Sequence, residues 1–97
     1  MAKSIKVTPK TLTDKATQLK NLNKNFKQKV ADLRSLEQKL DSMWDGDAND
    51  SFRKDFQKDA TQMDNFYNAV EAYVSTLNQI ADNYANAEAK NKALSEN

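Results

Sequence analysis

The chain has 97 residues, of which 38% are hydrophobic and 30% charged, with a formal net charge of +1. It contains no Cys, no His, one Gly and one Pro. These absences exclude a disulfide framework, an ordinary zinc site and the common His-based catalytic pairs. One Gly cannot form a phosphate-binding loop, nor can one Gly and one Pro supply the turns of a β-sandwich. The composition predicts a small all-α protein that acts by binding, with no enzymatic activity, no cofactor and no metal site.

Charge is distributed unevenly along the chain. Residues 1–43 carry ten Lys and Arg and four acids, a net of +6, whereas residues 44–97 carry five bases and ten acids, a net of −5. Opposite net charges favour packing of the two halves side by side. The lysines are spread around the helix with only Phe26 as an aromatic neighbour, so we predict no nucleic-acid-binding face.

A first helix is predicted over residues 9–43. Thr8 is a favourable N-cap, and Pro9 suits the first helical position, where its missing N–H costs nothing. Apolar residues then recur about every 3.4 positions, which is the period of a helix. These positions are Leu12, Ala16, Leu19, Leu22, Phe26, Val30, Leu33, Leu36, Leu40 and Met43.

A turn is predicted over residues 44–47. Gly46 suits the left-handed conformation that often ends a helix. Asp47 suits the N-cap of the next helix, with Asp50 near its positive end.

A second helix is predicted over residues 48–93, with neither Gly nor Pro to interrupt it. Its apolar residues recur about every 3.5 positions, the period of a coiled coil. They are Phe52, Phe56, Ala60, Met63, Phe66, Val70, Tyr73, Leu77, Ile80, Tyr84 and Ala87.

The two helices differ in length, at about 52 Å and about 69 Å for a rise of ~1.5 Å per residue. If the chain folds back at Gly46, the first helix ends near residue 82 of the second. We expect the second helix to overhang by about three turns that carry Tyr84 and Glu88, with only Ile5 and Val7 available to cover them.

Two helices cannot bury both sides of their apolar stripes, but two hairpins can do so as a four-helix bundle. We therefore predict a single domain over residues 1–97 that forms a homodimer, or alternatively a heterodimer with a related hairpin. The predicted core and dimer residues are Leu19, Leu22, Phe26, Val30, Leu33, Leu36, Leu40, Phe52, Phe56, Met63, Phe66, Val70, Tyr73, Leu77 and Ile80.

The turn contains the only Trp and the only Gly of the chain, as Trp44-Asp45-Gly46. Together with the length and the two helices, it resembles the WXG family, the ESAT-like substrates of bacterial type VII secretion. The segment Tyr84-Ala85-Asn86-Ala87-Glu88 is similar to the Tyr-x-x-x-Asp/Glu export signal of that family. The resemblance also includes Ile5-Lys6-Val7-Thr8-Pro9, Met43, Ala48, Phe52 and Phe56.

The resemblance implies a secreted protein without a cleaved signal peptide, exported from the cytoplasm as a folded dimer and acting through protein–protein binding as an effector or a secretion adaptor. It implies that Trp44 and Gly46 form a turn and recognition motif. It also implies that a membrane-bound type VII ATPase recognises Tyr84 and Glu88, which lie four residues apart on one helical face.

Other interpretations remain open at this point. Gly46 and Trp44 are also explained as a helix stop and a cap on the bundle, and Tyr84 as a continuation of the apolar stripe. An alternative function is a cytoplasmic adaptor or chaperone that pairs with the N-terminal helices of a larger type VII toxin. Membrane disruption is less favoured because it requires exposure of the dimer core, and no apolar run approaches the ~20 residues of a membrane span.

Overall fold

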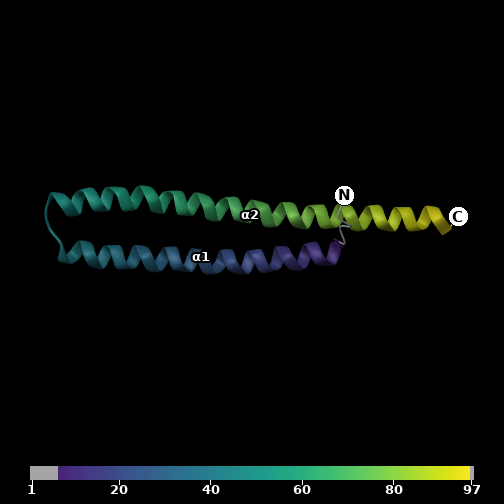
Figure 1. Ribbon diagram of the computed structural model, residues 1–97, viewed down its shortest axis with the longest axis horizontal. Helices are drawn as coiled ribbons and strands as arrows, with labels where there is room; N and C mark the ends of the chain where they lie inside the picture. Colours follow the sequence, from purple (N-terminus) through teal and green to yellow (C-terminus); the bar gives the residue numbers. More distant parts are fainter. Residues whose placement is uncertain (1–6, 97) are drawn as a thin grey trace, which may run out of the picture.

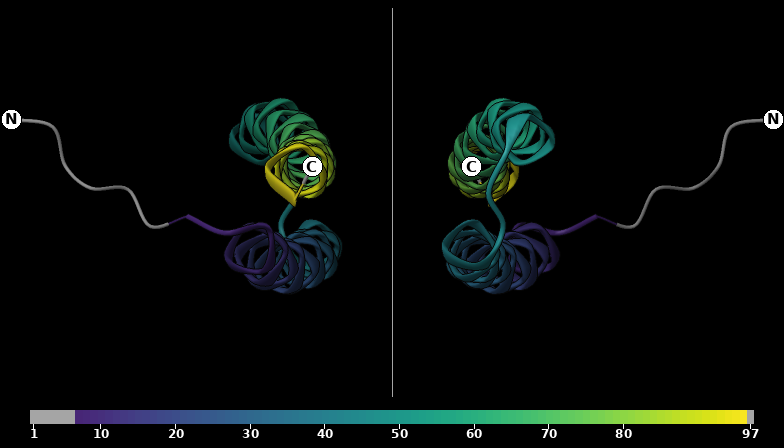
Figure 2. Two further views of the ribbon diagram at one scale, coloured as in Figure 1. Left: turned by 90° about the vertical axis from the view of Figure 1, so that its right-hand side faces the viewer. Right: turned by 90° about the vertical axis from the view of Figure 1, so that its left-hand side faces the viewer.

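The computed structural model describes residues 7–96 and consists there of two helices, α1 (Pro9–Met43) and α2 (Asp47–Glu96), with no strand in this range. The helices run antiparallel as a hairpin (Figure 1). End-on views show a single layer, with neither side of the pair covered by another element of the described chain (Figure 2). The radius of gyration is 21.8 Å, against about 12.5 Å for a compact domain of this length. The predicted all-α hairpin is confirmed. The structure contains one chain, so its dimerisation stays a prediction.

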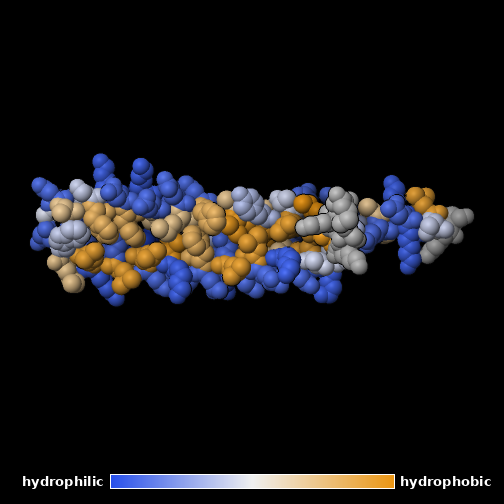
Figure 3. Space-filling view, in the orientation of Figure 1, coloured by the Kyte–Doolittle hydropathy of each residue, from blue (hydrophilic) through white to orange (hydrophobic). Residues whose placement is uncertain are grey.

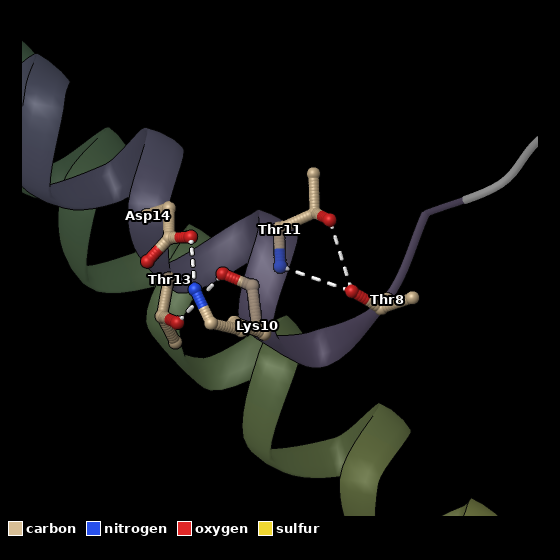
Figure 4. A network of polar contacts seen from close by, with 5 residues as sticks. All are labelled: Thr8, Lys10, Thr11, Thr13 and Asp14. Carbon is tan, nitrogen blue, oxygen red and sulfur yellow. Dashed lines mark hydrogen bonds and ion pairs between the residues drawn. The ribbon is translucent and has the colours of Figure 1, made fainter.

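The start of α1 is fixed by the side chain of Thr8. Its backbone is extended, with φ −112° and ψ 160°, and its Oγ1 accepts a hydrogen bond from the backbone N–H of Thr11 at 3.1 Å (Figure 4). This contact satisfies one of the N–H groups that a helix leaves free at its start. Pro9 follows at the first helical position, and Lys10 forms an ion pair with Asp14 one turn later.

The turn differs in detail from the expectation. Gly46 has φ +113°, outside the left-handed helical region but in the range that favours glycine. Its carbonyl accepts the backbone N–H of Asp50 at 3.2 Å, so Gly46 directly precedes α2 and does not end α1. Asp47 is the first residue of α2 and not its N-cap. The helix therefore begins one residue earlier than expected and continues three residues further, to Glu96.

Mainly small or polar side chains form the buried seam, the line along which α1 packs on α2. In α1 every seventh residue is buried, namely Ala16, Asn23, Val30 and Glu37. The buried residues of α2 are Asn49, Ala60, Val70, Val74 and Ala81. Small side chains allow close approach of the helices but remove little apolar area from water. The large apolar residues therefore lie elsewhere.

The C-terminal part of α2 extends beyond the start of α1 as an uncovered rod (Figure 1). Every residue from 82 to 95 is exposed. Val7 is half-buried, whereas Ile5, the other residue expected to cover this overhang, lies outside the described residues.

Candidate protein-interaction site

Large hydrophobic side chains gather on one side of the hairpin, along the line between the two helices (Figure 3). Several are more than half exposed, including Leu22 at 65% and Leu36 at 61%. We call this surface the apolar face. Its exposed members are Leu22, Leu33, Leu36, Leu40, Met43, Phe52, Phe66, Tyr73 and Ile80. Monomeric soluble proteins rarely expose a continuous apolar surface of this kind, and such surfaces mark interaction sites.

Two columns with a seven-residue repeat run along the middle of the apolar face. The α1 column consists of Leu12, Leu19, Phe26, Leu33 and Leu40, and the α2 column of Phe52, Asp59, Phe66, Tyr73 and Ile80. The columns meet at Phe26 and Phe66, whose ring centroids are 5.5 Å apart in an edge-to-face arrangement. A strict seven-residue repeat is typical of helices that pack in a left-handed coiled coil or a four-helix bundle.

The residues predicted for the core and dimer fall into three groups. Val30 and Val70 are buried within the hairpin. Leu19, Phe26, Phe56, Met63 and Leu77 are half-buried. The others, Leu22, Leu33, Leu36, Leu40, Phe52, Phe66, Tyr73 and Ile80, are exposed on the apolar face. One hairpin thus buries few of its large apolar side chains, and their role in a dimer remains a prediction.

The opposite side of the hairpin is polar. The guanidinium of Arg34 donates two hydrogen bonds to the carboxylate of Asp64, at 2.8 and 3.3 Å. This pairing lowers the pKa of Asp64. Nearby, the ammonium group of Lys27 lies 4.9 Å from the ring centroid of Tyr67. In these contacts a base of α1 meets an acid or an aromatic ring of α2. This agrees with the prediction that the basic and acidic halves of the chain pack side by side.

A polar cluster crosses between the helices near the turn. Arg53 pairs with Asp41 and approaches Glu37 at 3.9 Å, and Asn49 donates a hydrogen bond to Asp41 at 2.8 Å. The hydrogen bond from Asn49, followed by that from Arg53, lowers the pKa of Asp41. Here the acids lie on α1 and the base on α2, which reverses the average charge of the two helices.

Sequence reasoning missed the buried polar residues. Asn23 donates to the backbone carbonyl of Tyr67 at 3.0 Å and to Glu71 Oε2 at 2.9 Å. The signal that could have revealed Asn23 and Glu37 is their seven-residue spacing from Ala16 and Val30. A search for periodic apolar residues does not detect this repeat, because Asn23 and Glu37 are polar.

The two sequence motifs lie at opposite ends of the hairpin. Trp44 is half-buried beside the turn, with its ring centroid 5.8 Å from that of Phe52. Tyr84 and Glu88 are exposed one turn apart on the overhanging part of α2. The helix brings Tyr84 and Glu88 together, but the fold of one chain keeps both far from Trp44 and Gly46 (Figure 1).

Neither helix is long and apolar enough to span a membrane, as judged over residues 7–96. The same range contains no group of three or more Asp and Glu side chains placed to hold a metal ion.

The structure therefore defines a class of fold, an antiparallel helical hairpin with an exposed apolar face. A family model described as proteins of 100 residues with WXG matches residues 4–89, and the chain belongs to this WXG100 family. The resemblance to the WXG family is thereby confirmed.

Solved structures of the secreted protein EsxB from Bacillus anthracis str. Sterne are similar to this chain. The wild-type form is 28% identical with a TM-score of 0.77, and the match covers 89% of this chain and 91% of EsxB. The selenomethionine-labelled form is 27% identical with a TM-score of 0.77, and the match covers 91% of this chain and 99% of EsxB. No curated protein matches the chain.

Proposed function

We propose that this protein is a substrate of a bacterial type VII secretion system, exported as a folded dimer and active through protein–protein binding. The observation that carries the proposal is the apolar face. Water contact with side chains such as Leu36, Phe66 and Tyr73 is unfavourable by roughly 25 cal/mol per Å², so a second hairpin is expected to cover them. Membership of the WXG100 family and the similarity to a secreted protein support export.

The C-terminal overhang is the proposed secretion signal. Tyr84 is 42% exposed, and no described residue forms a hydrogen bond or an ion pair with the carboxylate of Glu88. An aromatic ring and a carboxylate one turn apart form a compact feature that the type VII ATPase recognises before the protein leaves the cytoplasm. In this proposal the protein then acts outside the cell, as an effector or an adaptor, without catalysis.

Trp44 and Gly46 form the second recognition element. If two hairpins pack antiparallel, the turn of one chain lies beside the overhang of the other. Within one chain, the turn and Tyr84 lie at opposite ends of the hairpin. The complete signal then exists only in the dimer.

The test is export from a bacterium that carries a type VII system. We expect Trp44→Ala, Tyr84→Ala and the dimer-breaking Leu33→Glu each to accumulate in cells and to be depleted from the medium. The matched control is Ala31→Glu, which adds the same charge to an exposed position of α1 that borders a cavity on the polar side. Normal export of all three variants would contradict the proposal.

The exposed apolar face also supports a second candidate, an adaptor or chaperone whose partner is the helical N-terminus of a larger type VII toxin. Two helices of a toxin would cover the same surface. The solution mass of the chain expressed alone discriminates between the two. A stable homodimer supports the exported dimer, whereas a chain that folds or associates only when co-expressed with a toxin supports the adaptor.

A further inference from the structure

A cavity on the polar side of the hairpin has a buried carboxylate in its lining. The cavity has a volume of about 340 Å³ and lies between α1 and α2, in the half of the hairpin nearer the turn. One water molecule needs only about 10–15 Å³ of such space, so the cavity has room for a larger group. Its lining includes Arg34, Glu37 and Gln38 from α1, and Arg53, Phe56 and Gln57 from α2.

The buried carboxylate belongs to Glu37. Its side chain is 6% exposed, and its Oε2 accepts no hydrogen bond from any residue of the described chain. Within residues 7–96 its one ion pair is with Arg53, whose Nε lies 3.9 Å from Oε2. The same guanidinium also pairs with Asp41. Burial of a carboxylate is costly unless donors or a cation compensate it, so Glu37 lacks a partner of its own.

The charges around the cavity do not balance. Arg34 donates two hydrogen bonds to Asp64, and Arg53 pairs with Asp41, so each guanidinium of the lining already has a carboxylate. The lining residues and their ion-pair partners therefore comprise three acids, namely Glu37, Asp41 and Asp64, and two bases, a net charge of −1. The surplus charge belongs to Glu37, and a cation is the group that would neutralise it.

An ammonium group suits this lining better than a metal ion or an anion. Hard metal cations take several oxygen ligands, and residues 7–96 contain no group of three or more acids placed to hold a metal ion. An anion would meet the buried charge of Glu37. An ammonium group carries three donors. Glu37 can accept one of them, and the side-chain amide oxygens of Gln38 and Gln57 can accept the others. Phe56 adds an aromatic ring, and such rings attract cations placed over their faces.

We propose that this cavity binds an alkylammonium group, with Glu37 as the counter-ion, Gln38 and Gln57 as further acceptors, and Phe56 against the alkyl chain. A lysine side chain of another protein and a free polyamine both present this group. The proposal depends neither on export nor on the dimer, because the cavity lies on the opposite side of the hairpin from the apolar face.

The first test titrates the isotope-labelled protein with n-butylammonium chloride and follows its backbone amide signals by NMR. We expect saturable shifts confined to the two segments that line the cavity, residues 34–38 and 53–61. The matched probe is sodium pentanoate at the same ionic strength, which carries the same butyl chain on a carboxylate. It is expected to cause no saturable shift in these segments.

The role of Glu37 is tested by Glu37→Gln, which removes the charge and keeps the size of the side chain. We expect it to weaken n-butylammonium binding at least about tenfold, because a hydrogen bond to a charged group is lost. The matched control is Asp32→Asn, the same kind of change at an exposed position of α1 outside the cavity, and its affinity is expected to be unchanged. Circular dichroism checks that both variants keep the helix content of the native chain.

A second measurement supplies the ammonium group from the chain itself. Thr61 is exposed and also lines the cavity. We expect Thr61→Lys to raise the urea midpoint more in the native background than in the Glu37→Gln background. Such a difference between the two backgrounds measures the coupling between the two side chains. Thr61→Gln is the control, because it adds a long polar side chain without charge, and it should have the same effect in both backgrounds.

Two further probes distinguish the sources of the group. Nα-acetyl-lysine amide represents a protein side chain, and putrescine represents a free polyamine. Because the lining has one surplus carboxylate, we expect the second ammonium group of putrescine to add no affinity and the lysine derivative to bind more tightly. Tighter binding of putrescine would assign the site to a free polyamine.

Two results would overturn the ammonium site. One is saturable binding of pentanoate as tight as that of n-butylammonium, and the other is an unchanged n-butylammonium affinity in Glu37→Gln. Either result would leave the proposed export and dimer untouched. Charge-selective binding that is lost in Glu37→Gln and retained in Asp32→Asn supports the site.

Discussion

Gly46 joins the two helices with a backbone conformation that other residues rarely adopt. Its φ of +113° places it where a Cβ is unfavourable, although no atom outside the neighbouring residues lies within 4 Å of the position that a Cβ would occupy. Glycine is therefore required at this position because of the positive φ, and not because a Cβ would clash with neighbouring atoms. It is satisfied locally, independently of how the helices pack.

Replacing Gly46 with alanine is expected to lower the free energy of unfolding by about 1–2 kcal/mol, the usual cost of positive φ in an L-residue. Urea denaturation followed by circular dichroism measures the change. A D-alanine at the same position, introduced by chemical synthesis, is the matched control, because it adds the same methyl group but favours positive φ. Equal destabilisation by both alanines would show that the methyl group itself causes the loss.

Asn23 shows what a residue type alone does not reveal. The residue is 3% exposed, and its side chain bridges to α2 through two hydrogen bonds, while its Oδ1 has no partner among the described residues. An asparagine in a helix is usually exposed. Only the packing of the second helix against it converts a polar position into part of the buried seam.

Between the two helices, ion pairs link α1 to α2 on the polar side and near the turn. Arg34 pairs with Asp64, and Arg53 with Asp41. Each pairing lowers the pKa of its carboxyl group in the folded protein, with the hydrogen bond from Asn49 contributing most at Asp41. The unfolded chain lacks these contacts.

These pairs predict a loss of stability in acid. A carboxyl group whose pKa is lower in the folded protein than in the unfolded chain stabilises the folded state. This stabilisation is complete at a pH above the pKa in the unfolded chain, which is near 4. It is lost as the pH falls through the pKa in the folded protein. We expect the urea midpoint to fall between about pH 5 and pH 2. The double variant Asp41→Asn and Asp64→Asn is expected to have a lower midpoint at pH 6 and a shallower fall. An equally steep fall in this variant would assign the acid sensitivity to other carboxylates.

Over its full length, the hairpin has more large apolar side chains than two helices can bury. No side chain of the described chain is both large and fully buried. The rod measures 77 × 28 × 15 Å, which is too thin to have an interior of its own. Its apolar face therefore supports the proposal that the stable form includes a second hairpin.

The mass in solution tests this directly. We expect sedimentation at micromolar concentration to give about twice the chain mass of 11.0 kDa. Leu33→Glu, which places a charge in the α1 column, is expected to weaken association at least about 100-fold, since a two-fold interface contains the substitution twice. Ala31→Glu should leave the dimer intact. Dissociation by both variants would show that added charge alone, and not its position, weakens association.

Much of this fold was predictable from local information. The capping preference of Thr8, the helical first position of Pro9 and the repeat of apolar residues each act within a few residues, so the bounds of α1 need no knowledge of the partner element. The exact start of α2 was not predictable in this way, because both Gly46 and Asp47 suit a helix boundary. The actual hydrogen bond from Asp50 to Gly46 distinguishes between them.

Local sequence patterns were enough to establish two long helices with a break at Gly46, and they include the motifs that mark the WXG family. Periodicity and capping are properties of neighbouring residues, which is why they could be recognised without coordinates. The packing of α1 on α2 sets which apolar residues the helices bury against each other and which they leave in water. That division depends on the rotation of one helix against the other. Small side chains and buried amides such as Asn23 lie at the closest approach, and the larger leucines and aromatics point toward an open face.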